Sequence, residues 1–488
     1  MKKYSKLKNV TFFLILFMSS PLFCTLVNPM PGENLWHLTA AIGTVVDELA
    51  LEQVSCCSKI DRLIERTTDQ CDLANTFSAI AATIQSKIDE CCACNHTPIF
   101  QATTITASGT YCLANNISGR IVISADQTVV DLNQHTITNN GSIAITISSN
   151  VDGITIQNGY INSATTGISA SSGNSGIIVN NVSMDTIENG ISLASATQVN
   201  ISNVDIRFTS TAGSGIQLTN TKNINIAHSN VTGTGAGQLY GFNTCNVANV
   251  INCTAKNIST TNTIFGFNIV NCIGVNLNSC TATSNSQLNN IQGFSISGQA
   301  VASQSAYLTD CTAINCALGF NTSIGDGVYI LESCLACQNN INYGLGRSKG
   351  LLINCTADGG NIGFTINDTS NGAIINCQAI QCAGNGFSGG DANSWLIKNC
   401  NANKNSSNGF SFSSASSVKN AIENCTATNN TGTGFVGTGD NRSIFYENQA
   451  SGNIAGNYLN VVATPSANIR LFTNSIISRV DNVRNIAP

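Results

Sequence analysis

Four charged residues are the candidates for catalytic chemistry in this chain. Asp185 and Glu188 lie close together in one repeat, and Asp205 and Arg207 follow in the next. Paired carboxylates held a few ångströms apart are what polysaccharide hydrolysis requires, and an Arg beside them suits base-assisted chemistry. The same four residues would equally form a surface salt bridge, and that is the reading we favour.

Cysteine is the other residue type that could do chemistry, and the chain has 21 of them. A first group comprises Cys56, Cys57, Cys71, Cys91, Cys92 and Cys94. In an exported chain such a cluster predicts disulfides. The alternative is zinc, because Cys91 and Cys94 have CxxC spacing. The sequence does not reveal which cysteines pair.

A second group of cysteines recurs within a tetrapeptide of the form Asn-Cys-Thr-Ala. Its members are Cys253, Cys280, Cys311, Cys334, Cys355, Cys377, Cys400 and Cys425. A free Cys packs as a small hydrophobe, so we expect a buried ladder of reduced, inert thiols. Cys334 and Cys337 also form a CxxC pair. Because Cys334 belongs to the ladder, we assign no metal site and no redox site there.

The elements that carry these cysteines are short strands. In the segment from 351 to 357, alternation places Leu351, Ile353, Cys355 and Ala357 on one face, and we expect that face to point inward. A Gly-Phe step follows most repeats, at Gly241, Gly266, Gly293, Gly319, Gly363, Gly386, Gly409 and Gly434. The steps recur at the spacing of coil-type solenoids.

The residue before each ladder cysteine predicts a corner. Asn stands there at 252, 354, 376, 399 and 424, and Ser279, Asp310 and Ser333 replace it elsewhere. Asn tolerates the left-handed backbone that a sharp bend needs. In the last matching segment Asn448 stands where the cysteine would be. Since each coil is too thin to bury its own apolar face, coils must stack in parallel. A leucine-rich repeat is rejected because the chain lacks its Leu-x-x-Leu-x-Leu pattern.

The ends of the chain differ from the repeats. Residues 1–24 predict a signal peptide, with basic residues before an apolar run that is too short to span a bilayer. Cys24 is either removed with this segment or carries a lipid. Residues 25–99 have helical periodicity and predict two helices, either a hairpin on the end of the solenoid or a coiled coil that makes a homo-oligomer. Residues 457–488 predict a terminal cap over the open stack.

A family resemblance rests on the segment from Gly109 to Ile137. It contains Tyr111-Cys112-Leu113, Asn116-Ile117, Ile121-Val122-Ile123 and Val130-Asp131-Leu132-Asn133-Gln134-His135-Thr136-Ile137. It resembles the opening coils of right-handed parallel β-helix proteins of the pectin-lyase-like superfamily, with Gln134 in place of the usual Gly. The resemblance implies an all-β solenoid, a right-handed parallel β-helix over residues 100–456 with about 14–15 coils.

The superfamily hosts enzymes and non-enzymes, so the resemblance does not decide function. Motifs of the polygalacturonases are absent from the chain, and calcium is expected only if the protein is a lyase. Charged residues make up 10% of the chain and the net charge is −5, which argues against nucleic acid. We therefore expect an exported or surface-associated protein, secreted, periplasmic or on the cell surface, that binds carbohydrate or a cell surface without catalysis. The alternative is a polysaccharide lyase or epimerase.

Overall fold

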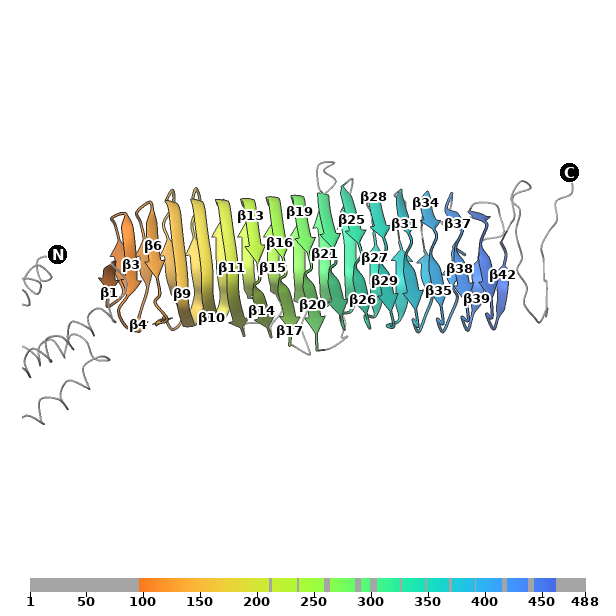
Figure 1. The fold of residues 1–488 in the computed structure, drawn as a ribbon, viewed down its shortest axis with the longest axis horizontal. Coiled ribbons are helices and arrows are strands. Elements are labelled where there is room, and N and C mark those ends of the chain that lie inside the picture. The colour runs from red at the N-terminus through yellow and green to blue at the C-terminus, as the bar shows by residue number, and fades with distance from the viewer. Residues whose placement is uncertain are drawn as a thin grey trace, which may run out of the picture. The chain divides into compact units, whose positions relative to one another are not determined.

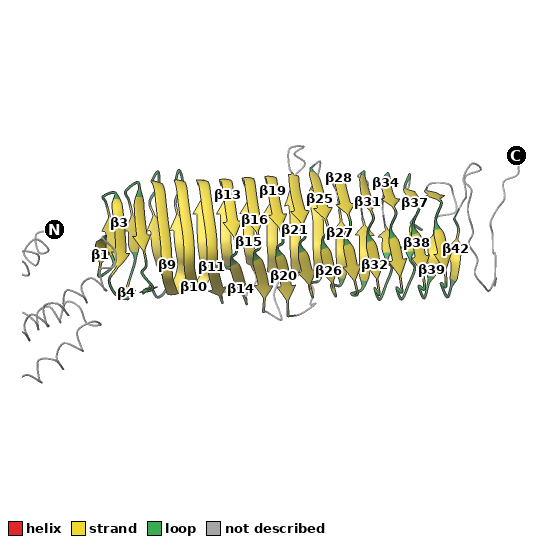
Figure 2. Cartoon of the chain, viewed as in Figure 1, coloured by secondary structure: helices red, strands yellow, loops and turns green. Residues whose placement is uncertain are grey.

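The computed structural model describes residues 96–209, 213–234, 237–258, 264–285, 291–298, 305–324, 327–346, 349–367, 371–390, 392–414, 419–437 and 443–461. Within these ranges the regular structure consists of strands and contains no helix, as Figure 2 shows. The chain divides into two compact units. The predicted signal peptide, the two predicted helices and nearly all of the predicted cap lie outside the described residues.

The first unit takes in residues 1–100 and 111–115. Its described part is a parallel pair formed by β1 (Thr97–Ile99) and β3 (Gly109–Leu113), with Pro98 opposite Cys112. The backbone N–H of Ala114 donates to the carbonyl of Ile99 at 3.0 Å and continues this pairing past the strand end.

The second unit is a stack of coils, each of which contributes one strand to each of three parallel ribbons. We call the first ribbon the aliphatic sheet, because its inward row is formed by residues such as Leu331, Leu352 and Ile374. Its strands are the first parts of β9 (Asp152–Ala170), β10 (Ser175–Ala194) and β11 (Thr197–Phe208), with β6 (Thr128–Asp131), β13 (Lys222–Ala227), β16 (Asn246–Ile251), β19 (Ile273–Asn278), β22 (Ser305–Thr309), β25 (Val328–Glu332), β28 (Lys349–Ile353), β31 (Gly372–Ile375), β34 (Trp395–Lys398), β37 (Ala421–Glu423) and β40 (Ile444–Tyr446).

The second ribbon follows the cysteine corner, and we call it the alanine sheet after its inward row. That row includes Ala357, Ala379 and Ala402, all completely buried. Its strands are the middle parts of β9 and β10, the end of β11, and β4 (Ile117–Ser118), β7 (Thr136–Thr138), β14 (Asn230–Gly233), β17 (Thr254–Asn257), β20 (Thr281–Ser284), β23 (Thr312–Ile314), β26 (Leu335–Cys337), β29 (Thr356–Asp358), β32 (Gln378–Ile380), β35 (Asn401–Asn403), β38 (Thr426–Thr428) and β41 (Gln449–Ser451).

The third ribbon carries the Gly-Phe steps, and we call it the aromatic sheet. Its strands are the ends of β9 and β10, and β2 (Thr103–Ile105), β5 (Ile121–Ile123), β8 (Ile143–Ile147), β12 (Ser214–Thr219), β15 (Gly237–Asn243), β18 (Ile264–Val270), β21 (Gln292–Gly298), β24 (Leu318–Ile324), β27 (Ile341–Leu345), β30 (Ile362–Ile366), β33 (Phe387–Gly389), β36 (Phe410–Ser411), β39 (Thr433–Val436) and β42 (Gly456–Leu459). Strands of one ribbon lie side by side in chain order, as the colours of Figure 1 show. The predicted fold class is confirmed: the protein is an all-β parallel solenoid of about 14 turns.

The corners between the ribbons follow from residues that accept a left-handed backbone. The corner between the aliphatic and alanine sheets has φ between 50° and 56° in each coil that carries the tetrapeptide or its last variant. The residues are Asn252, Ser279, Asp310, Ser333, Asn354, Asn376, Asn399, Asn424 and Glu447. The predicted corner is therefore confirmed, and Asn predominates there because it adopts this conformation at low cost.

The predicted inward face of the segment from 351 to 357 is wrong for the part before the corner. Cys355 and Ala357 point inward as expected, but Leu352 is the buried leucine, while Leu351 and Ile353 lie on the outer face of the aliphatic sheet. The chain turns at the left-handed residue Asn354, so the alternation of inward and outward side chains before the corner does not continue in the same phase after it. Two apolar residues that we placed in the core are thus on the surface.

Candidate functional site

Asp185, Asp205 and Arg207 lie on neighbouring rungs of the alanine sheet, and Glu188 follows Asp185 on β10. Asp185 of β10 is the register partner of Arg207 of β11, and Asp205 is the partner of Ser183. Asp185, Glu188 and Arg207 are exposed and Asp205 is half-buried. Within the described ranges no ion pair joins Asp185 to Arg207. The register thus brings the residues together, but nothing buries them or holds two carboxylates in a fixed geometry.

The described residues also contain no group of three or more His, Cys, Asp or Glu side chains that could hold a metal ion. Among the same residues, no helix has the length and apolar character needed to cross a bilayer. The six N-terminal cysteines expected to form disulfides, from Cys56 to Cys94, lie outside the described residues. Cys112, which we did not assign to a disulfide, is disulfide-bonded.

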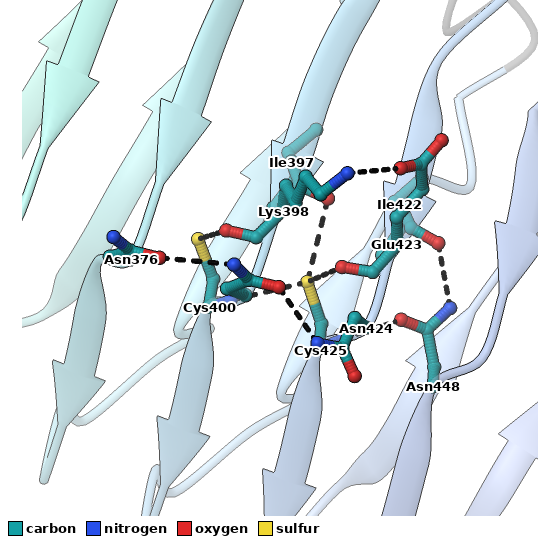
Figure 3. A network of polar contacts seen from close by, with 10 residues as sticks. Asn376, Ile397, Lys398, Cys400, Ile422, Glu423, Asn424, Cys425 and Asn448 are labelled. Carbon is teal, nitrogen blue, oxygen red and sulfur yellow. Dashed lines mark hydrogen bonds and ion pairs between the residues drawn. The ribbon is translucent and has the colours of Figure 1, made fainter.

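The eight cysteines of the tetrapeptide are free thiols buried in the interior of the coil stack. Figure 3 shows two of them with their bonds. The Sγ of Cys425 accepts the backbone N–H of Cys400 at 3.4 Å and lies 3.5 Å from the carbonyl oxygen of Ile397, to which its S–H donates. The Cys425 thiol therefore bonds two peptide groups of the coil before it.

Asn448 takes over this role in the following coil. Its Oδ1 accepts the backbone N–H of Cys425 at 2.8 Å, and its Nδ2 donates to the carbonyl of Ile422 at 2.8 Å. Ile422 is the register partner of Ile397. The asparagine amide thus makes the same acceptor and donor contacts as the cysteine thiol, with shorter and stronger bonds.

A second inner corner, between the alanine and aromatic sheets, uses the same two residue types. Asn405 accepts the backbone N–H of Cys382 at 3.0 Å and donates to the carbonyl of Ala379 at 3.1 Å. Asn430 repeats this pattern one coil later and also accepts from the Nδ2 of Asn405 at 2.9 Å. Our sequence reasoning missed this corner, although Asn or Cys recurs there at Cys316, Asn339, Cys382, Asn405, Asn430 and Asn453.

Burial suppresses the acidity of four of the interior thiols. Burial raises the pKa of Cys316 and of Cys382 to about 12. It also raises the pKa of Cys377 and Cys425 well above the ordinary value, and hydrogen bonds to neighbouring thiols add to the shift. A reactive cysteine needs a stabilised thiolate and access to solvent. These four interior thiols have neither, so they contribute packing and hydrogen bonds.

Beside the cysteine ladder runs a continuous stack of aromatic rings inside the aromatic sheet. Successive ring centroids are 4.5–5.5 Å apart and the planes lie within 11° of parallel. The stack comprises Tyr240, Phe267, Phe294, Phe320, Tyr343, Phe364, Phe387, Phe410, Phe435 and Tyr458. The hydroxyl of Tyr343 donates to the carbonyl of Cys334 at 2.6 Å, which ties this stack to the cysteine corner.

One of the predicted Gly-Phe steps is out of register with the stack. Tyr240 is the register partner of Phe267, whereas Gly241 pairs with Asn268 and Phe242 pairs with Ile269. The ring in the stack is therefore Tyr240, and Gly241 is not equivalent to Gly266 and the later glycines. At most of those later positions a Cβ would collide with the alanine sheet, as at Gly409, where it would lie 2.9 Å from the Cβ of Ala427.

The outer face of the aromatic sheet carries a row of hydroxyl, amide and glycine residues, which we call the polar row. Register pairs join its members from coil to coil. They are Thr146, Ser169, Ser192, Gln217, Gly241, Asn268, Ser295, Asn321, Gly344, Thr365, Ser388 and Ser411. The row contains no charged residue. The sequence carried a signal for it that we missed, because Asn, Ser or Thr follows most Gly-Phe steps.

A second outer row flanks the polar row and is largely apolar. It comprises Gln238, Phe265, Gln292, Leu318, Ile341 and Ile362, all half-buried. Two hydrogen bonds join the rows: Asn268 Nδ2 donates to Gln238 Oε1 at 2.8 Å, and Asn321 Nδ2 donates to Gln292 Oε1 at 2.9 Å. We call the two rows together the candidate site. Three of its polar atoms, Thr146 Oγ1, Asn268 Oδ1 and Thr365 Oγ1, have no hydrogen-bond partner.

The comparison with protein families agrees with this fold. Residues 289–450 match a family model described as a right-handed β-helix region. No curated protein sequence matches the chain. Among solved structures, the A-module of the mannuronan C-5 epimerase AlgE4 from Azotobacter vinelandii is 14% identical, with a TM-score of 0.35, and the match covers 77% of this chain and 92% of that one.

Two further solved structures are those of a surface adhesin and of a glucanase catalytic domain. The surface adhesin PfbA of Streptococcus pneumoniae is 9% identical, with a TM-score of 0.24 and coverage of 78% of this chain and 89% of that chain. The catalytic domain of a GH87 α-1,3-glucanase is 14% identical, with a TM-score of 0.24 and coverage of 73% and 61%. Residues 289–450 thus match a right-handed β-helix region, which agrees with the parallel ribbons of the structure.

Proposed function

We propose that this is an exported protein that binds a neutral carbohydrate polymer along the candidate site of the aromatic sheet, without catalysis. The observation that carries the proposal is the polar row with its apolar neighbour. Hydroxyl and amide groups can exchange hydrogen bonds with sugar hydroxyls, and side chains such as Phe265 can cover the apolar faces of sugar rings.

The regular spacing of the polar row supports binding of a polymer at this site. The coil repeat presents equivalent groups at a regular interval of roughly 4.8 Å. A periodic surface of this kind suits a repeating polymer better than a single small molecule.

The absence of charge in the row indicates which polymers bind. Uronic-acid polymers carry a carboxylate on each residue, and nothing in the polar row would neutralise it. We therefore expect neutral glucans and related polymers to bind more tightly than polyuronates, and we expect no metal ion to be required.

The proposal is tested with the mature full-length protein in affinity electrophoresis or calorimetry against a panel of neutral and uronic-acid polymers. Asn321→Asp places a charge in the polar row and removes the amide that bonds Gln292. It should weaken binding to a neutral polymer at least fivefold, equivalent to about 1 kcal/mol. The matched control is Asn276→Asp on the outer face of the aliphatic sheet, where Asn276 is exposed, and it should leave affinity unchanged.

Three outcomes would overturn the proposal. The first is that no polymer binds, and the second is that both variants lose affinity equally. The third is shortened chains, epimerised residues or the ultraviolet absorbance of unsaturated products, because these would identify the protein as a lyase or epimerase. Calcium-dependent turnover would point to the lyase in particular.

A further inference from the structure

The outer face of the aliphatic sheet changes character along the stack. One outer row passes in register through Asn200, Asn225, Asn249 and Asn276, then through Tyr307, Ile330, Leu351, Ala373, Leu396 and Ala421. The Asn section is a ladder of amide hydrogen bonds, such as Asn225 to Asn200 at 3.3 Å. From β22 onward the row is apolar.

A second outer row runs beside it on the same strands. Its members from β22 to β37 are Thr309, Glu332, Ile353, Ile375, Lys398 and Glu423. We call the six rungs of these two rows the aliphatic patch. The inward row of the same strands, including Leu331 and Ile374, is already completely buried. Strands that are apolar on both faces are typical of sheets covered on both sides.

Within the described part of the chain, the strands of this sheet contact strands of neighbouring coils and no layer packs over their outer face. The aliphatic patch is therefore a sheet face that lacks a covering layer among the residues that the structure describes.

We propose that the occupant is a second copy of this chain, held by a two-fold axis that runs parallel to the strands between β28 and β31. Such an axis brings the two patches face to face and reverses the order of the rungs, so β25 faces β34 and β28 faces β31. Residues of one row then face residues of the same row in the partner, and each contact occurs twice, as in any isologous interface.

The charges of the patch complement each other under this axis. Glu332 on β25 faces Lys398 of the partner on β34, and Lys398 faces Glu332 of the partner. Ile353 faces Ile375 between the two ion pairs. Lys398 and Glu423 form a surface ion pair at 3.3 Å with side chains 46% and 33% exposed. Glu332 is half-buried and accepts a hydrogen bond from Tyr307. Lys398 can therefore turn toward a partner without leaving a buried charge behind.

The shapes of the first row are also complementary. Leu351 faces Ala373, Tyr307 faces Ala421, and Ile330 faces Leu396, so large side chains meet small ones at two of the three rungs. A two-fold axis that ran along the stack, midway between the two rows, would instead set Glu332 against Ile330 and Lys398 against Leu396, so neither charge would meet an opposite charge. The six rungs extend over roughly 24 Å at roughly 4.8 Å per rung, so we expect a modest interface and a dissociation constant in the micromolar range.

The test is sedimentation velocity of the full-length mature protein over a concentration series. The wild type should pass from monomer to dimer. Glu332→Lys sets lysine against Lys398 and should raise the dissociation constant at least tenfold. The double variant Glu332→Lys with Lys398→Glu restores opposite charges and should recover dimerisation. Asn225→Lys, on the same outer row but outside the patch, should change nothing.

Each alternative result overturns the proposal. A wild type that is monomeric at all concentrations leaves the patch without this partner. An oligomer that is insensitive to Glu332→Lys must form elsewhere, as it would through the predicted N-terminal helices. A double variant that stays dissociated excludes the pairing of Glu332 with Lys398. Circular dichroism of each variant separates loss of association from loss of fold.

Discussion

Asn448 accepts the backbone N–H of Cys425 at 2.8 Å. One coil earlier, the thiol of Cys425 accepts the equivalent backbone N–H of Cys400 at 3.4 Å. Asparagine and cysteine are therefore alternatives for one structural task. Each must be small, accept one peptide N–H and donate to one carbonyl at a corner that has no room for water. Serine does the same at Ser229, which accepts the N–H of Val204 at 3.3 Å and donates to the carbonyl of Ala227 at 2.9 Å.

This equivalence predicts an unusual tolerance to substitution. Cys425→Asn should extend the asparagine ladder by one coil and change the free energy of unfolding by less than about 1 kcal/mol. Cys425→Asp has nearly the same shape but replaces the donor with a buried carboxylate facing the carbonyl of Ile397, and should cost about 3 kcal/mol or more. Chemical unfolding of both variants measures the difference. Equal losses would show that the corner selects for size alone.

A second prediction concerns the glycines that precede the stacked rings. A Cβ at position 409 would lie 2.7 Å from the carbonyl oxygen of Gly434 and 2.9 Å from Ala427. Gly409→Ala should therefore destabilise the protein by about 1–3 kcal/mol. The matched control is Gly344→Ala on the outer face of the same sheet, where the nearest atom is 3.5 Å away. Thermal unfolding should show a lower midpoint for the first variant only.

The corners were predictable because their requirement is local. A residue such as Asn354 must adopt a left-handed backbone, and few residue types do so at low cost, so repetition of Asn at that position reveals the bend. Cys355 and Ala357 follow the bend at a fixed offset, and their burial could be inferred from it.

The phase of the strand before the corner was not predictable from alternation. Leu351, Leu352 and Ile353 are all apolar, so the pattern does not distinguish the buried residue from its exposed neighbours. The choice is made by the register with Leu331 and Ile374 in the adjoining coils. Likewise, Tyr240 and Phe242 are both aromatic, and only pairing with Phe267 selects Tyr240 for the stack.

The candidate site was missed for a related reason. Residues such as Ser295 and Thr365 look like ordinary polar residues of a repeat, and their significance appears only when coils are stacked and the residues form one row. Asp185 and Arg207 were candidates because charged residues are rare in this chain. The structure pairs them in register, but both side chains are exposed.

Alkaline pH should destabilise the solenoid through its buried thiols. The pKa of Cys316 and Cys382 is raised by burial from 9.0 to about 12, so the folded protein holds these protons more tightly than the unfolded chain does. Their contribution to stability is complete below pH 9 and is lost as the pH rises toward 12. Each thiol should add up to about 1.4 kcal/mol per pH unit to the decline. Denaturant midpoints measured at several pH values test this, and the double variant Cys316→Ala with Cys382→Ala should show a shallower decline.

The last prediction concerns which thiols react. The ladder cysteines are buried and hydrogen-bonded, whereas Cys337 is half-buried on the alanine sheet. Brief treatment of the native protein with a maleimide should therefore label Cys337 first, and denaturation should be needed to label the ladder. We expect Cys56, Cys57, Cys71, Cys91, Cys92 and Cys94 to resist labelling until reduction, because we predict that they are oxidised, and peptide mapping would identify the partner of Cys112. Parallel, in-register side chains cannot readily take the torsion that a disulfide needs. Disulfide-linked peptides between neighbouring ladder positions would therefore contradict the register of the coils. Labelling of Cys355 in the native protein would contradict the inert role that we assign to the ladder.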